Sequence, residues 1–342
     1  MEFCKKGLAG GLEIDCTLEH GKAALEFRVK LQKAVAEEML EQSGAIPVFC
    51  REGYLDIRMW DKEGRPAFCC CHPLACEEPA KGLMLHPHLW QGIKDPYLYE
   101  VEVSLMERKD YVTDRVKTTY AFRNLEEIPG KGWFLNGSPY QARAVEYELP
   151  ISDSVAGVSN QKAFRIRLRR DMELIKEMGA NTVCPAGEEK NRELCKICDE
   201  LGLLVRRNDN SDIPRFHGTE NSLLTMRERI PAERYYFYKA CWSEAPFVYI
   251  SAESLGLQKN GYAQVTIYSN QKRVALYVDG VLFAFKTDGP DFCFQDIPVK
   301  RLPLMLTAET GACSMSYTGY PFTEFSQNHH FSMTFDAYND IS

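Results

Sequence analysis

Two glutamates near the middle of the chain have a spacing that permits acid–base chemistry. Glu146 and Glu148 stand at the end of residues 141–147, a segment that we expect to be a strand entered from a hairpin turn at Asn136–Gly137. Residues two apart on a strand share a face, so the two carboxyl groups can approach to roughly 5 to 7 Å. A retaining glycosidase uses two carboxylates about 5 Å apart, one as acid/base and one as nucleophile. We favour the simpler interpretation of two solvated carboxylates, because nothing in the sequence supplies a second wall to enclose a sugar.

A second group of residues has the side-chain types that bind metals. The group consists of Cys69, Cys70, Cys71, His72, Cys76, His86 and His88. Structural zinc sites pair cysteines two to four residues apart with a second pair downstream, and this spacing does not fit that pattern. Successive strand residues face opposite ways, so three adjacent cysteines cannot easily share one ion. We therefore expect buried strand cysteines, and neither a metal nor a cofactor.

The composition is that of a soluble globular protein and excludes several classes. The chain has 342 residues, of which 45% are hydrophobic and 26% charged, and its net charge is −7. It has no basic block, which argues against nucleic acid binding. No apolar run is long enough for a signal peptide or a membrane span. Thirteen cysteines without a secretion signal are typical of reduced thiols, so we expect a cytoplasmic protein of two or three domains.

Residues 1–128 are predicted to form an all-β domain. Its candidate strands alternate apolar and polar residues, the period of a half-buried strand. They cover residues 12–18, 24–31, 54–60, 98–105 and 115–122. Several short strands separated by turn signals predict a β-sandwich. Trp90 could stack on a sugar, but we favour packing inside the sandwich.

Residues 129–232 combine short apolar strands with amphipathic helices. The two helix faces carry Leu168, Met172, Ile175 and Met178, and then Leu194, Ile197, Cys198 and Leu201. Residues 181–184 and 203–205 are predicted to be buried strands. Together with residues 141–147 they give the strand–helix order of parallel βαβ units. Residues 206–232 are polar and are predicted to be a linker.

Residues 233–342 are predicted to form a second β-sandwich with an aromatic tail. Its candidate strands are residues 247–250, 263–268, 274–278, 304–308 and 313–317. The tail begins at Tyr320, and residues 330–335 alternate well enough to add a strand in this chain or in another. The fold class is therefore mainly β, with two sandwiches flanking a small α/β part.

Seven motifs occur in an order that is characteristic of one enzyme family. They are HPHLWQGIKDPYLYEVEVSL, YAFRN, GWFLNGSPYQARAVEYE, RRDMELIKEMGANTV, CDELGLLV, RYYFYKACWSEAPFVYI and VTIYSNQKRVALYVDG. Together they resemble family 2 of the glycoside hydrolases, the β-galactosidase and β-glucuronidase group. The resemblance implies that both sandwiches are immunoglobulin-like and that the α/β part is the start of a (β/α)8 barrel.

The resemblance also implies that the catalytic half of the barrel is missing. Such a barrel needs about 250 residues, whereas only about 90 separate the entry hairpin from the second sandwich. The family carries both catalytic glutamates on later strands, and no Asn-Glu dipeptide occurs between Val205 and Ala232. Glu146 and Glu148 replace the Asn and His of the family's first strand end. Residues 206–208, Arg-Arg-Asn, replace its acidic pair after the third strand.

Two functions from different classes follow. The first is a non-catalytic family member, a scaffold, accessory or carbohydrate-binding protein in carbohydrate metabolism, with no catalytic residues. The second is an active β-glycosidase whose site is completed by a partner subunit or by unrecognised carboxylates, with Glu146 and Glu148 as the candidates. A metal-binding protein built on the Cys/His segment is a third and weaker alternative.

The incomplete α/β part is expected to have two open edges. Residues 203–205 lack a fourth strand as a neighbour, and residues 141–147 lack an eighth. Unpaired edges recruit other chains, so self-association or a partner subunit is expected there. Residues 206–232 look too polar to supply much apolar area, which leaves the sandwiches and the aromatic tail as the cover.

Overall fold

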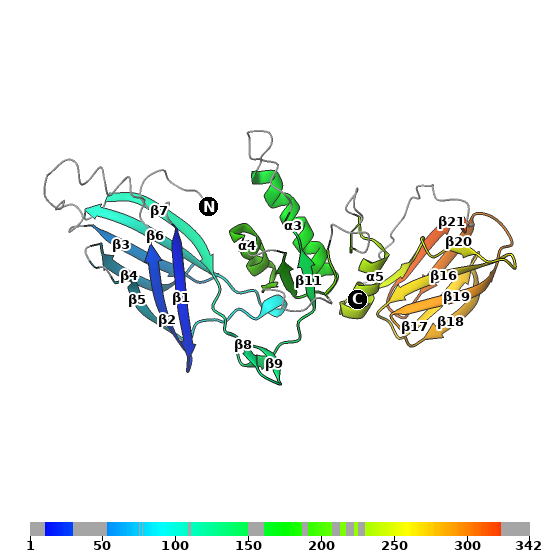
Figure 1. The fold of residues 1–342 in the computed structure, drawn as a ribbon, viewed down its shortest axis with the longest axis horizontal. Helices are drawn as coiled ribbons and strands as arrows, with labels where there is room; N and C mark the ends of the chain where they lie inside the picture. The colour runs from blue at the N-terminus through cyan, green and yellow to red at the C-terminus, as the bar shows by residue number, and fades with distance from the viewer. Residues whose placement is uncertain are drawn as a thin grey trace. The chain divides into compact units, whose positions relative to one another are not determined.

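The computed structural model describes most of the chain in two compact units. The described residues are 11–29, 53–74, 76, 78–108, 111–149, 161–186, 191–206, 213–216, 222–224 and 230–322. One unit comprises residues 1–141 with 195–202, and the other comprises residues 142–194 with 203–342. Strands predominate in both units (Figure 1), so the mainly β class with a small α/β part is confirmed.

The first unit is built on two antiparallel sheets. One sheet has the order β1-β2-β5, with β1 (Leu12–Glu19), β2 (Lys22–Val29) and β5 (Ala80–Leu85). The other has the order β4-β3-β6-β7, with β4 (Pro66–Pro73), β3 (Tyr54–Trp60), β6 (Tyr99–Arg108) and β7 (Tyr111–Tyr120). Alternation decides which side chains enter the core: Leu55, Ile57 and Met59 of β3 are buried, while the residues between them are more exposed. The sandwich expected in this region is present.

A short 3-10 helix and a small sheet complete the first unit's described elements. The 3-10 helix η1 covers Gly92–Lys94. The small sheet has the order β10-β9-β8, with β8 (Leu125–Ile128), β9 (Gly132–Leu135) and β10 (Ser138–Pro139). Asn136 and Gly137 turn the chain between β9 and β10 with positive φ angles of 51° and 79°, as the hairpin dipeptide predicted.

The end of a helix from the middle of the sequence belongs to this first unit. The helix α4 covers Arg192–Leu201, and its residues from position 195 onward are part of the unit. Trp90 is fully buried, and its indole Nε1 donates a hydrogen bond to the carbonyl oxygen of Asp199 at 3.0 Å. The Arg123 guanidinium lies 4.6 Å from the centre of the Trp90 ring and forms an ion pair with Asp199. Trp90 is therefore buried as expected, but it packs against α4 and is not one of the residues of the sandwich core.

The α/β part opens the second unit. Three parallel strands have the order β11-β12-β13, with β11 (Ala144–Tyr147), β12 (Thr182–Pro185) and β13 (Leu204–Val205). Helix α3 (Gln161–Glu177) connects β11 to β12. Val183 of β12 is opposite Val145 on one side and Val205 on the other. The parallel strand–helix order predicted from periodicity is present.

The edge of β11 that was expected to be open is occupied by part of the predicted linker. The Glu146 N–H donates to the carbonyl of Pro214, and the Phe216 N–H donates to the carbonyl of Glu146, both at 2.9 Å. This is a parallel bridge, and Leu223 and Leu224 pair in turn with this segment. The expectation that residues 206–232 are too polar to cover the edge is wrong, because three of their apolar side chains are buried at the edge. Phe216, Leu223 and Leu224 are all buried.

A helix and a second sandwich complete the second unit. Helix α5 covers Glu233–Trp242. One sheet contains β14 (Val248–Ile250), β15 (Gly256–Leu257), β16 (Tyr262–Ser269) and β19 (Asp291–Pro298), with β16 at its centre. The other has the order β18-β17-β20-β21, with β17 (Arg273–Val278), β18 (Val281–Thr287), β20 (Leu304–Glu309) and β21 (Ser314–Gly319). The strand expected at residues 330–335 lies outside the described residues.

Helix α5 packs against the C-terminal end of α3. The Tyr235 hydroxyl donates to the carbonyl of Leu174 at 3.2 Å, and Lys239 Nζ lies 2.5 Å from a carboxylate oxygen of Glu177. Gly179 caps α3 with φ +92°, and a Cβ placed on it would lie 2.4 Å from the carbonyl carbon of Trp242. A glycine is required there by both the backbone angle and the close approach.

Candidate functional site

The carboxyl ends of the parallel strands are the natural place to look for a ligand site. Side chains and loops at these ends form the binding crevice in α/β sheets. In this chain the ends of β11, β12 and β13 bring together Glu146 and Glu148, then Cys184 and Ala186, and then Arg206. The two glutamates picked out from the sequence are therefore on the face where the chemistry would be expected.

Glu146 is held in an ion pair. Arg215 Nε lies 2.8 Å from its carboxylate oxygen Oε2, and the two residues are also joined by the parallel bridge between their backbones. The Glu146 side chain is only 22% exposed. Its carboxylate is therefore held by a guanidinium that the same fold brings beside it.

Glu148 has a different environment. It lies just beyond the end of β11 and is exposed, and it forms no ion pair with any described residue. Tyr147, which stands between the two glutamates, points the other way and is fully buried. Its hydroxyl donates to Asp171 Oδ2 of α3 at 2.7 Å. The structure thus separates one paired carboxylate from one solvated carboxylate and encloses neither.

The described residues at the ends of the two neighbouring strands supply no further acid. Cys184 is buried, and the N–H of Ala186 donates to the carbonyl of Tyr147 at 2.8 Å, which closes the end of β12 with a backbone contact. Arg206 follows β13, and its N–H donates to the carbonyl of Val183 at 3.1 Å. Among residues 182–186 and 204–206 no side chain carries a carboxylate.

The sequence analysis missed Arg215 and Asp171 as partners of the strand-end residues. Arg215 lies 69 residues after Glu146, inside a segment that was predicted to be a linker. Asp171 stands between apolar positions on α3, where a buried acid has no local signal. The one available sign was Phe216, an apolar residue beside Arg215 in an otherwise polar stretch.

The Cys/His segment does not form a metal site in the described part of the chain. No group of three or more described His, Cys, Asp or Glu residues is arranged to hold an ion. Cys69 and Cys71 lie on the exposed face of β4, opposite Arg58 and Asp56 of β3, while Cys70 faces the other way. The expectation of buried cysteines is wrong for Cys69, Cys71 and Cys76, which are exposed. Burial does raise the pKa of the half-buried Cys70 thiol.

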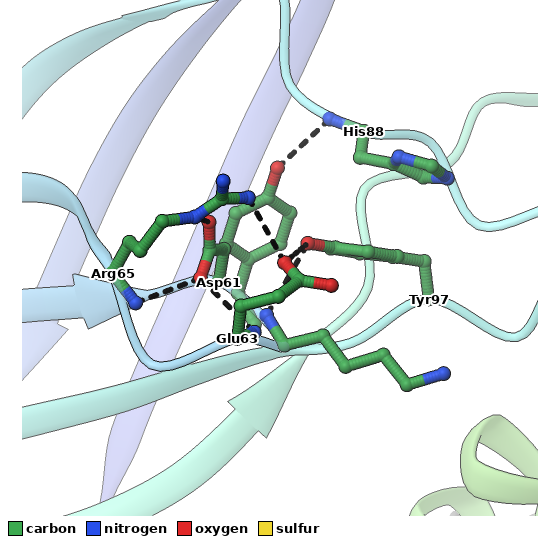
Figure 2. Close-up of polar contacts among 7 residues, drawn as sticks. Asp61, Glu63, Arg65, His88 and Tyr97 are labelled. Atoms are coloured by element: carbon green, nitrogen blue, oxygen red, sulfur yellow. Dashed lines mark hydrogen bonds and ion pairs between the residues drawn. The ribbon is translucent and has the colours of Figure 1, made fainter.

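His88 belongs to a separate polar network around the turn between β3 and β4. Figure 2 shows Asp61 accepting hydrogen bonds from Arg65, whose guanidinium also reaches Glu63. The Tyr97 hydroxyl accepts the N–H of Lys62 at 3.2 Å, and the Tyr97 ring stacks on His88 with 3.9 Å between ring centres.

The hydrogen bonds of this network stabilise the turn between β3 and β4, and they engage the polar groups that could otherwise take part in a reaction. Partial burial works against ionisation of Asp61, but the hydrogen bonds from Arg65 outweigh it and lower the pKa of the carboxyl group. The carboxylate is therefore the stable form at neutral pH, and it acts as an acceptor for the turn. We assign these residues a structural role.

Comparison with known proteins matches part of the chain to one family. Residues 52–123 match Glycosyl hydrolases family 2. A protein of Formosa agariphila named "Putative beta-glucuronidase" is 38% identical over 120 residues, which is 35% of this chain and 14% of that protein. Beta-galactosidase BoGH2A of Bacteroides ovatus is 29% identical over 119 residues, 35% of this chain and 13% of that protein.

Solved structures resemble the chain over a much longer span. An FMN-binding β-glucuronidase from Facaelibacterium prausnitzii L2-6 superposes with a TM-score of 0.72 at 14% identity, over 91% of this chain and 74% of that one. The β-glucuronidase of Parabacteroides merdae superposes with a TM-score of 0.68 at 13% identity, over 92% of this chain and 65% of that one. At such identities the likeness concerns the fold. The segments matched in the curated relatives span only 12–17% of their length.

Proposed function

Because this chain belongs to family 2 of the glycoside hydrolases, we propose that it is a non-catalytic member with an accessory or carbohydrate-binding role in carbohydrate metabolism. The observation that carries the proposal is the ion pair between Arg215 and Glu146 at the end of β11. A segment from beyond the α/β helices lies along β11 where the family would place its last barrel strand, and it brings this arginine with it.

The geometry of the two glutamates supports this proposal. A retaining mechanism needs a nucleophilic carboxylate facing the sugar and a second carboxyl group that is protonated in the ground state. Burial in an apolar pocket is what keeps such an acid protonated near neutral pH. Glu148 is exposed to water, and Glu146 is turned to a guanidinium, so neither has the environment of a general acid.

The proposal is tested by hydrolysis of aryl β-galactosides and aryl β-glucuronides by the purified full chain. We expect no turnover above the buffer rate. Turnover that disappears in both Glu146→Gln and Glu148→Gln, with thermal unfolding unchanged in the two variants, would refute the proposal and identify the pair as catalytic.

The location and assembly of the protein are part of the same proposal. Among the described residues, no helix is long and apolar enough to cross a membrane. None of the eleven described cysteines forms a disulfide, and we propose a cytoplasmic location, where reduced thiols are favoured. We also propose that β13, at the remaining edge of the α/β sheet, is a point of association with a second copy or a partner subunit; light scattering of the purified chain tests this.

A further inference from the structure

The outer face of α3 gathers positive charge that the composition of the chain conceals. The net charge is −7, and the sequence showed no basic block when taken as a whole. The first half of the helix nevertheless presents a set of cationic side chains around one exposed apolar residue. We call this set the α3 cationic surface, and it consists of Lys162, Arg165, Ile166, Arg167, Arg169 and Arg170. All of them are exposed except Arg169, which is half-buried.

Three of these cations have no anionic neighbour. Lys162, Arg167 and Arg170 form no ion pair with any residue in the described part of the chain. The acid nearest to them in sequence, Asp171, is buried and takes the hydrogen bond from Tyr147 on the inner side of the helix. The charge of these three side chains is therefore not neutralised by an ion pair within the described residues.

The other two arginines form long ion pairs. Arg165 lies 3.6 Å from a carboxylate oxygen of Glu193, and Arg169 lies 4.0 Å from one of Glu173. Exposed ion pairs of this kind are worth about 0–1 kcal/mol, so a ligand with better geometry can displace them.

The α3 cationic surface lies at the ligand-binding end of the sheet. Because α3 connects two parallel strands, it runs antiparallel to them, and its first turns stand at their carboxyl ends. In Figure 1 these turns stand clear of β11 and α5. Arg192, the exposed first residue of α4, lies at the same end for the same topological reason. The positive field thus covers the face where an α/β protein binds its ligand.

We propose that the α3 cationic surface binds an acidic polysaccharide through the carboxylates of its uronate residues. This inference rests on the proposed carbohydrate-binding role and names its ligand class. Arginine forks match carboxylates in two parallel hydrogen bonds, and Lys/Arg-rich stretches of this length mark polyanion sites of the heparin type. From Lys162 to Arg170 the helix rises about 12 Å, long enough to engage more than one sugar of an extended chain. Ile166, 62% exposed, offers an apolar surface for the C–H face of a sugar ring.

A uronate chain fits this surface better than a nucleic acid. Duplex DNA carries about one charge per 1.7 Å, and its binding needs a broad basic footprint that a chain of net charge −7 does not offer. The α3 cationic surface is confined to the exposed side of one helix, and it includes an exposed apolar residue, Ile166. A polymer with one carboxylate per sugar and apolar ring faces matches both features.

The test measures binding of the full chain to polygalacturonate by titration calorimetry, with neutral dextran and single-stranded DNA as comparison ligands. The informative variant is the double charge reversal Arg167→Glu/Arg170→Glu. Both positions are exposed, and glutamate has a helix propensity close to that of arginine, so the variant should fold. The matched control is Lys259→Glu/Lys300→Glu, which makes the same change in net charge on two exposed lysines of the second sandwich.

We expect salt-sensitive binding of polygalacturonate that the α3 variant weakens by about tenfold or more, while the control stays within about twofold. Thermal unfolding of each variant establishes that it is folded. Absence of binding at low ionic strength, an equal loss in both variants, or DNA bound as tightly as polygalacturonate would each overturn the inference. Turnover of aryl glycosides would overturn the proposed function instead, and it is measured separately from binding.

Discussion

At the scale of single residues, the position of Arg215 decides the role of Glu146. An exposed strand-end glutamate is chemically competent, and its spacing from Glu148 suits a carboxylate pair. Because the Arg215 guanidinium lies 2.8 Å from the Glu146 carboxylate, this side chain instead links β11 to the segment that covers the edge of the sheet. The ion pair is partly exposed, so it contributes little free energy. Its main effect is to align residue 215 with residue 146 of β11.

We therefore predict that removing the Arg215 charge changes the free energy of unfolding little and that removing the neighbouring Phe216 ring changes it much more. Arg215→Ala should lower the free energy of unfolding by no more than about 1 kcal/mol. Phe216→Ala should lower it by about 3–5 kcal/mol, because it leaves a cavity against Tyr147 in the buried edge of the sheet. Urea unfolding measures both. Phe285→Ala, at a phenylalanine that is 55% exposed, is the control and should cost about 1 kcal/mol or less. Equal losses for all three would contradict the assignment of Phe216 to the sheet edge.

Asp199 gives a prediction about pH. Burial raises the pKa of its carboxyl group above the ordinary value of 3.8, and the attraction of Arg123 only partly offsets this. For an acid whose pKa is higher in the folded state, the folded state binds the proton more readily, so stability falls as pH rises from the unfolded pKa to the folded pKa. Relative to Asp199→Asn, the wild-type chain should therefore lose stability as the pH rises above the ordinary pKa of 3.8. We propose measurements from pH 4 to pH 7. Urea midpoints across that range test this, and a gain of stability with pH would show that Arg123 dominates.

At the scale of elements, the ends of α3 and α4 are determined by close backbone contacts. Gly202 ends α4 with φ +84°, and a Cβ on it would lie 2.6 Å from the carbonyl oxygen of Gly92 in the first unit. Gly179 ends α3 in the same way against Trp242 in the second unit. Each helix is thus fixed at its C-terminal end by a neighbour that leaves no room for a side chain.

Gly179→Ala should therefore be far more harmful than an ordinary change of a turn glycine. The left-handed backbone costs an alanine about 1–2 kcal/mol, and the clash with the Trp242 carbonyl adds to it, so we expect a loss of about 3 kcal/mol or more. Gly261→Ala is the control in the same unit, since φ is +83° there and nothing lies within 4 Å of the added Cβ. Chemical denaturation measures the difference, and indistinguishable losses would show that α5 moves away from α3 without penalty.

At the scale of the whole molecule, the first unit is discontinuous in sequence. Its sandwich comes from the first 141 residues, but Trp90, Arg123 and Gly92 all contact residues 195–202. A family domain border drawn along the sequence would separate these partners. The described contacts indicate that α4 is as much a part of the sandwich unit as of the α/β part.

A fragment of residues 1–141 should accordingly be less stable than the same unit in the full chain. Without residues 195–202 the Trp90 indole loses its hydrogen-bond acceptor, and Arg123 loses its carboxylate. Calorimetry should show a lower Tm for the fragment, and adding a peptide of residues 191–206 should raise it by mass action. A fragment as stable as the intact unit, and indifferent to the peptide, would show that the α4 contacts are dispensable.

The sequence alone determined the elements whose signals are local. Period-two alternation identified ten of the sandwich strands but not β4, β5, β15, β18 or β19. Three- and four-residue spacing identified α3 and α4, and the order of strands and helices predicted a parallel sheet. Asn136–Gly137 and Gly179 marked turns because their backbone conformations depend on the residue itself. The family motifs were recognisable for the same reason, since each is a short contiguous stretch.

Only the tertiary structure decided which segments meet. Phe216 and Arg215 come to β11 across a polar segment that gives no strand signal, and residues 195–202 join a sandwich that ended about 50 residues earlier in the chain. Closing a longer loop adds little entropy cost, so the chain can bring a distant partner to a strand edge as readily as a near one. Local periodicity carries no information about that choice. The tertiary structure also determines which face of α3 stays exposed. The positive charge that we propose for ligand binding lies on that face.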